Sequence, residues 1–141
     1  MNRRMVAHIL GLVLLILAAL LLLPMLCAVV CGESVLPFVY TLLIVAAVGG
    51  VLLLFRPRTR EIYAKEGLAT VGLSWVLMSL LGALPFVFSG DIPRYVDAVF
   101  ETVSGFTTTG ASILTNVEAL SRSGLFWRSF THWLGGMGVL V

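Results

Sequence analysis

Long apolar runs constrain this chain more than any other feature of its sequence. A helix needs about 20 apolar residues to cross the hydrocarbon core of a bilayer, and residues 5–30, 36–55 and 67–88 each form such a run. Hydrophobic residues make up 60% of the 141 residues and charged residues 11%, whereas a soluble domain carries about 25% charged residues. We therefore predict an all-α integral membrane protein with several transmembrane helices.

The first run raises the alternative of a cleaved signal peptide, because Arg3 and Arg4 precede it. A signal peptide's apolar region spans about 7–15 residues, and this run is longer, which favours a retained transmembrane helix. Pro24 is expected to kink this helix, and Pro85 lies near the end of the third run. Residues 49–50 are both glycine, which favours close packing of the second helix.

Basic residues predict the orientation in the membrane. Arg3 and Arg4 precede the first run, and four of the nine basic residues lie in segment 56–66 between the second and third runs. Two crossings place these segments on one side, and the positive-inside rule makes that side cytoplasmic. We therefore expect a cytoplasmic N-terminus, with residues 31–34 and 89–123 outside or dipping in from outside.

The final segment, 124–141, begins a fourth apolar span. The chain stops within it, and a helix that ends uncapped in lipid is costly. The expectation is therefore a fragment, or one repeat of a longer protein. Cys27 and Cys31 leave a disulfide open, and without neighbouring histidines or carboxylates they do not predict a metal site.

Residues 89–123 are too polar for a span but carry a helical pattern. Asp97 is expected to be a helix N-cap, and Gly105 a helix stop. Apolar residues fall at helical spacing between them: Val96, Val99, Phe100 and Val103. A helix of about ten residues is about 15 Å long, half a bilayer.

The polar stretch GFTTTGAS at residues 105–112 follows this half-helix. Irregular backbone at membrane depth is tolerated only where protein buries it or where it lines a water-filled path. Threonine carbonyls and hydroxyls can replace the hydration shell of a cation, and Gly110 can adopt positive φ. The negative C-terminal end of the half-helix would favour a cation there.

Charged residues near this stretch have structural interpretations. Asp97 is expected to cap the helix, with ion binding as the alternative. Glu101 is expected to be partnered, since a charge at membrane depth is costly, with a direct contribution to the cation field as the alternative. Arg128 is expected at the outer interface, paired with a carboxylate such as Glu118.

A half-helix, then Thr-Thr-Gly, then a second helix resembles the pore loop of potassium channels, whose filter reads Thr-Val-Gly-Tyr-Gly. Here Ala111 and Ser112 stand where those channels carry Tyr and the second Gly. A filter with a single glycine resembles the Trk/Ktr/HKT superfamily of potassium transporters. The stretches that most resemble the bacterial Trk membrane subunit, TrkH, are GALPF at 82–86, DAVFETVSGFTTTGA at 97–111, and FWR with HWLGGMG between 126 and 138.

This resemblance implies a pore built from four linked helix–pore loop–helix units, each supplying one quarter of the selectivity filter. Residues 1–66 would form two peripheral transmembrane helices and a basic cytoplasmic loop. Residues 67–141 would form the first unit, with its last helix truncated. Potassium would bind the backbone carbonyls of Thr108 and Thr109, with Gly110 completing the stretch and Thr107 and Ala111 flanking it.

The resemblance also implies potassium uptake across the bacterial plasma (inner) membrane by a homodimer. A cytoplasmic nucleotide-binding regulatory subunit similar to TrkA would be its partner. No organic cofactor is implied beyond the transported potassium ion. The small net charge of +2 gives no basis for nucleic-acid binding.

Two other functions stay open on sequence grounds. Four copies of the chain could form a homotetrameric cation channel, or the helices could be a membrane scaffold that transports nothing. An enzyme is not predicted, because His132 with Ser104 or Ser129 has no orienting acid and no nucleophile turn.

Overall fold

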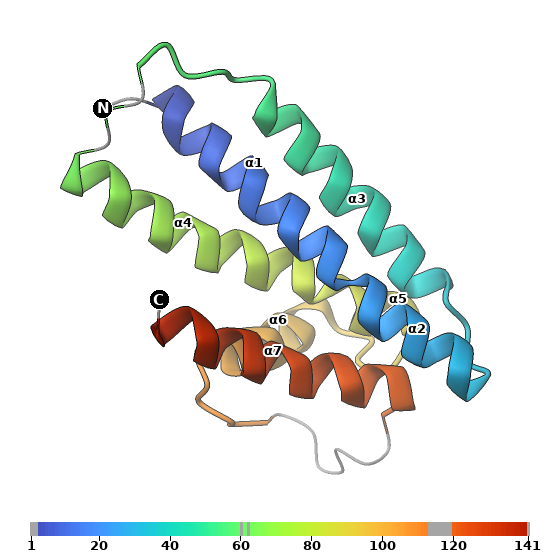
Figure 1. The fold of residues 1–141 in the computed structure, drawn as a ribbon. Coiled ribbons are helices and arrows are strands. Elements are labelled where there is room, and N and C mark those ends of the chain that lie inside the picture. The colour runs from blue at the N-terminus through green and yellow to red at the C-terminus, as the bar shows by residue number, and fades with distance from the viewer. Residues whose placement is uncertain (1–2, 60, 62, 113–119, 141) are drawn as a thin grey trace.

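The structure is a computed structural model that describes residues 3–59, 61, 63–112 and 120–140, and its regular elements there are all α-helices. This confirms the predicted all-α class. The helices are α1 (Arg3–Leu20), α2 (Leu22–Cys31), α3 (Leu36–Leu53), α4 (Ala64–Gly82), α5 (Leu84–Ser89), α6 (Tyr95–Phe106) and α7 (Arg122–Leu140) (Figure 1).

Prolines interrupt two of the long apolar segments. Pro24 has no amide to donate, and its ring clashes with the carbonyl of the residue four positions earlier, which is Leu20. Accordingly α1 ends at Leu20 and α2 begins at Leu22, as the predicted kink requires. Pro85 similarly follows the break between α4 and α5.

Three segments of the described chain are long and apolar enough to cross a membrane: Arg3–Cys31, Leu36–Leu53 and Ala64–Ser89. The predicted fourth span does form a helix, α7, but that helix is not among them. Arg122, Arg128 and His132 make α7 less apolar than the other three segments.

Helices α1 and α3 pack closely at a pair of glycines. A Cβ added to Gly11 would lie 2.8 Å from the Gly49 carbonyl oxygen, and one added to Gly49 would lie 3.2 Å from the Gly11 carbonyl oxygen. Close packing was predicted for both glycines of α3. It is confirmed for Gly49, whereas Gly50 faces open space with nothing within 4 Å.

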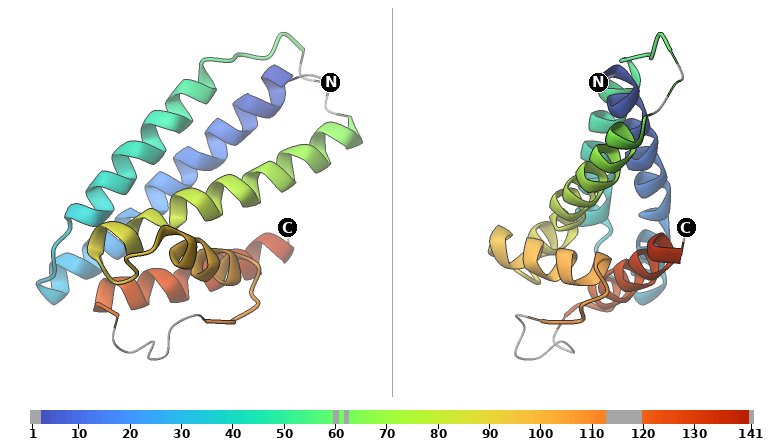
Figure 2. Two further views of the ribbon diagram at one scale, coloured as in Figure 1. Left: turned by 180° about the vertical axis from the view of Figure 1, so that it is seen from behind. Right: turned by 90° about the vertical axis from the view of Figure 1, so that its left-hand side faces the viewer.

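Short helix α6 and helix α7 lie side by side, against one end of the group formed by α1, α3 and α4 (Figure 2). Trp127 of α7 is fully buried in the core, and its indole Nε1 donates a hydrogen bond to the Gly82 carbonyl at 2.9 Å. The core around it includes Leu14, Leu17, Phe38, Phe86 and Phe106. The core therefore joins α7 to the helices that precede it.

Two carboxylates from earlier turns hold the start of α7. Glu33 accepts hydrogen bonds from the amides of Arg122 (2.7 Å) and Ser123 (3.0 Å) and from the Ser123 hydroxyl (2.6 Å). Asp91 accepts one from the Ser121 hydroxyl at 2.7 Å. Desolvation raises the pKa of Glu33, but the hydrogen bonds from Ser123 and Arg122 outweigh it, so the pKa lies below its ordinary value. The turn after α2 therefore caps α7 with a charged group.

The two cysteines of the first apolar segment, Arg3–Cys31, are not joined by a disulfide. Cys27 and Cys31 are both free thiols on α2, so the disulfide left open by the sequence does not form. Among the described residues, no group of three or more histidine, cysteine or acidic side chains could hold a metal ion.

Candidate functional site

Helix α6 is short, with 12 residues, which corresponds to about 18 Å. It begins at Tyr95, because Arg94 is extended (φ −87°, ψ 123°) and its carbonyl accepts the first helical bond, from Ala98 at 3.1 Å. The prediction of Asp97 as the N-cap is therefore wrong: Asp97 lies in the first turn, where its charge still favours the helix N-terminus. The Tyr95 hydroxyl donates to the Leu80 carbonyl at 2.8 Å and anchors this end to α4.

The chain turns back onto the end of α6 immediately after it. The helix ends at Phe106, one residue beyond the predicted stop at Gly105. The next four amides all donate to carbonyls of its last turn: Thr107 to Val103 (2.9 Å), Thr108 to Gly105 (3.0 Å), Thr109 to Ser104 (2.9 Å) and Gly110 to Ser104 (3.4 Å). The amides of residues 107–110 are thus all bonded to carbonyls at the end of α6.

Backbone torsions along this segment alternate in sign. Thr107 has φ −83°, Thr108 φ 57°, and Gly110 φ 77°, whereas Thr109 is not among the residues with positive φ. Alternating handedness turns successive amides to one side, in agreement with the hydrogen bonds that these amides donate to the end of α6. Positive φ was predicted for Gly110 and is confirmed. It was missed for Thr108, where a β-branched residue in this conformation is uncommon and marks a constrained backbone.

The carbonyl side of the segment is open. Within the described part of the chain, no hydrogen bond is donated to the carbonyl oxygens of Thr108, Thr109 or Gly110, and residues 107–112 are exposed. A backbone carbonyl in the hydrocarbon region of a bilayer requires a partner, because no water is there to hydrate it. The hydroxyls of the same segment bond locally: Thr107 to the Val103 carbonyl (2.6 Å) and Thr108 to the Thr107 carbonyl (2.7 Å). Thr108, Thr109 and Gly110 thus present consecutive free oxygens.

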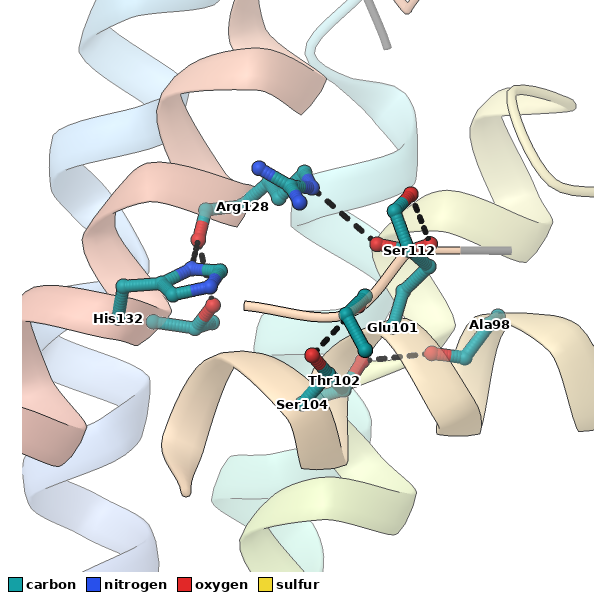
Figure 3. Close-up of polar contacts among 9 residues, drawn as sticks. Ala98, Glu101, Thr102, Ser104, Ser112, Arg128 and His132 are labelled. Carbon is teal, nitrogen blue, oxygen red and sulfur yellow. Dashed lines mark hydrogen bonds and ion pairs between the residues drawn. The ribbon is translucent and has the colours of Figure 1, made fainter. Parts of the chain in front are cut away.

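Glu101 lies behind the segment and is paired, as predicted. It is 1% exposed, and its Oε2 lies 3.2 Å from Nε of Arg128 on α7 (Figure 3). The predicted partner of Arg128 was wrong, because Arg128 pairs with Glu101; Glu118 lies outside the described residues. The Ser112 hydroxyl donates to Oε1 of Glu101 at 2.6 Å.

Glycines allow α7 to approach the end of α6. A Cβ on Gly105 would lie 2.2 Å from Oγ1 of Thr131, and one on Gly135 would lie 2.0 Å from the Phe106 carbonyl oxygen. The residue after Phe106 is the first of the exposed segment. Close contact with α7 therefore fixes where segment 107–111 begins.

The predicted site residues fall into two groups in space. The stretch formed by Thr107, Thr108, Thr109, Gly110 and Ala111 is continuous and exposed. Asp97 and Glu101 lie on α6, with Glu101 buried and Asp97 partly buried. Sequence reasoning missed Ser104 and Ser112, although the spacing of Glu101 and Ser104 by three residues places both on one helix face.

Comparison with known proteins finds relatives that are named as transporters. A model of the cation transport protein family TrkH matches residues 35–141. The chain is 38% identical over 96% of its length to an uncharacterized cation transporter of Methanocaldococcus jannaschii. It is 35% identical over its whole length to the Trk system potassium uptake protein TrkH of Salmonella typhimurium.

A solved structure agrees with the fold. The crystal structure of the potassium transporter TrkH from Vibrio parahaemolyticus superposes with a TM-score of 0.91 at 33% identity, over 99% of this chain and 31% of that one. The chain spans about 30% of the length of the curated relatives it matches. These relatives are transport proteins and not enzymes, which agrees with the prediction from sequence.

Proposed function

The chain belongs to the TrkH family of cation transport proteins, and from this we propose that it takes part in potassium uptake, with residues 107–111 as one quarter of a selectivity filter. The carbonyl oxygens of Thr108 and Thr109 would bind potassium, and Gly110 would complete the stretch. Thr107 and Ala111 would flank it. Three further quarters would complete the pore.

The single observation that carries this proposal is that, among the described residues, no hydrogen bond is donated to the consecutive carbonyl oxygens of Thr108, Thr109 and Gly110. Carbonyls that face one direction replace the water around a cation without covalent chemistry. The C-terminal end of helix α6 carries a partial negative charge next to the segment, while the charge of Glu101 on the same helix is paired with Arg128. A cation is the partner that both features favour.

Further elements of the proposal follow from the same family. Residues 1–66 would be a peripheral part and residues 67–141 the first pore unit. The N-terminus would be cytoplasmic in the inner membrane, the transporter a homodimer, and a TrkA-like nucleotide-binding subunit its regulator. Arg56 and Arg58 lie between α3 and α4, and Lys65 lies in the first turn of α4, at the end of the molecule that the positive-inside rule assigns to the cytoplasm.

Two substitutions at Gly110 test the proposal. A Cβ there meets nothing within 4 Å, so space is not limiting, but φ of 77° is. Asn tolerates this conformation, whereas β-branched Val is strongly disfavoured in it. The test uses a host that lacks potassium uptake and expresses the full-length gene. We expect Gly110→Val to abolish growth at low potassium and Gly110→Asn to support more growth than Gly110→Val.

Gly72→Ala is the matched control, because a Cβ at Gly72 also meets nothing within 4 Å and lies in helix α4. The host that expresses Gly72→Ala should grow as well as the host that expresses the parent protein. A Gly110→Val protein that reaches the membrane and supports growth equal to the parent's would contradict the filter.

A further inference from the structure

A cluster of polar side chains, in which Glu101 and Ser104 are buried, ties residues 111–112 to helices α6 and α7. Its centre is Glu101, whose two carboxylate oxygens have different partners. Oε1 accepts the hydroxyl of Ser112 at 2.6 Å, and Oε2 lies 3.2 Å from Nε of Arg128 (Figure 3). One side chain thus joins α6, the segment after the free carbonyls, and α7.

A second tie comes from the same face of α6. Ser104 lies three residues after Glu101, which places the two side chains on one side of the helix. Its hydroxyl donates to the Ala111 carbonyl at 2.5 Å. Ala111 and Ser112 are therefore each held by a side chain of α6, whereas residues 107–110 are held through their amides.

The chemistry of this cluster favours positioning over stability. An ion pair at low dielectric gains little net stability over apolar side chains of similar size, because both charges must be desolvated. A hydrogen bond to a charged acceptor is, however, about twice as strong as a neutral one and constrains direction. The guanidinium of Arg128 is always charged, so it offsets the Glu101 charge while the carboxylate holds Ser112.

We infer that Glu101 is a positioning residue that, through Ser112, sets the spacing of the Thr108 and Thr109 carbonyls and with it the discrimination of potassium from sodium. This inference rests on the proposed function. Selection between the two ions depends on cavity size and on the field of the coordinating carbonyls. Segment 107–112 is fixed at its start by Phe106 and at its far end by Glu101 and Ser104, so release of the far end changes that spacing.

Two variants separate the tie from the ion pair. Ser112→Ala removes the hydroxyl and leaves Glu101 beside Arg128. Glu101→Gln keeps the size of the side chain but removes its charge, so both the hydrogen bond from Ser112 and the ion pair with Arg128 are weakened. Thr102→Val is the matched control. Thr102 is also fully buried on α6, and among the described residues its hydroxyl bonds only to the Ala98 carbonyl of the same helix, at 2.8 Å.

The experiment uses the purified protein, expressed as its gene encodes it, with two readouts. The first is the ratio of potassium to sodium uptake in proteoliposomes. The second is hydrogen exchange of the amides in segment 107–112. We expect Ser112→Ala to lower the uptake ratio by roughly threefold to tenfold and to speed exchange by a similar factor, the range for loss of one hydrogen bond. Glu101→Gln should do both more strongly, and Thr102→Val neither.

The two readouts distinguish two failures. A parent protein without potassium uptake refutes the proposed function, and unchanged exchange in Ser112→Ala and Glu101→Gln refutes the tie whatever the parent transports. Faster exchange with an unchanged uptake ratio would overturn the inference as well, because the tie would then be structural and not a determinant of selectivity.

Discussion

Gly135 is the position where one added methyl group should disturb the exposed segment most. An alanine Cβ would lie 2.0 Å from the Phe106 carbonyl oxygen and 2.6 Å from its carbonyl carbon. Both are backbone atoms, so no side-chain rotation can relieve the clash. Ordinary contact begins at 3.4 Å, so α7 and the end of α6 must separate by about 1.4 Å, the difference between 3.4 and 2.0 Å.

The expected cost can be set from two opposing effects. Overpacking a close contact costs about 1–3 kcal/mol. Alanine is better than glycine in a helix by about 0.8–1 kcal/mol, which offsets part of it. Because the clash is with backbone, the cost should lie at the upper end of its range, about 3 kcal/mol, which leaves a net loss of about 2 kcal/mol in the free energy of unfolding for Gly135→Ala. Potassium uptake through the proposed filter should also fall, since Phe106 directly precedes Thr107.

Gly136→Ala provides the control on the same helix. Its Cβ would meet only Cγ2 of Thr108, at 3.9 Å, an ordinary contact. This variant should be as stable as the parent or more stable by up to about 1 kcal/mol. Thermal unfolding in detergent and potassium-dependent growth measure both effects. Equal melting temperatures for Gly135→Ala and the parent would refute the close approach of α6 and α7.

Three further predictions concern contacts outside the exposed segment. Glu33→Gln should lower the free energy of unfolding by about 1 kcal/mol near pH 7, as loss of a helix cap does. Because the pKa of Glu33 is lowered in the folded protein, the difference between parent and variant should disappear as the pH falls below about 4 and through that lowered pKa. A difference that does not depend on pH would contradict the cap. Gly11→Ala should lower the melting temperature, since its Cβ lies 2.8 Å from a backbone oxygen, whereas Gly50→Ala should not; equal effects would exclude the described packing of α1 on α3. Trp127→Phe removes the hydrogen bond to Gly82 and should cost about 1–3 kcal/mol in denaturant unfolding, and an unchanged midpoint would argue against that bond.

Local signals in the sequence predicted the helices and their interruptions. Apolar runs of membrane length predicted the three spanning segments, and Pro24 predicted a break that depends only on the residue four positions earlier. Gly110 predicted positive φ, because glycine lacks the Cβ that disfavours this conformation. The start of α6 was predicted less well, since Asp97 is a good cap by type, but the extended conformation of Arg94 starts the helix at Tyr95.

Contacts between distant residues were decided only by the tertiary structure. The sequence offers Arg128 several carboxylates, and its partner, Glu101, is 27 residues away. Gly49 and Gly50 are adjacent residues of the same type, and so are Gly135 and Gly136. A Cβ added to Gly49 or Gly135 would meet backbone atoms, whereas one added to Gly50 or Gly136 would meet almost nothing. Residue type and local spacing determine whether a helix forms, but the direction in which each side chain points, and the atom it then meets, depend on how the helices cross.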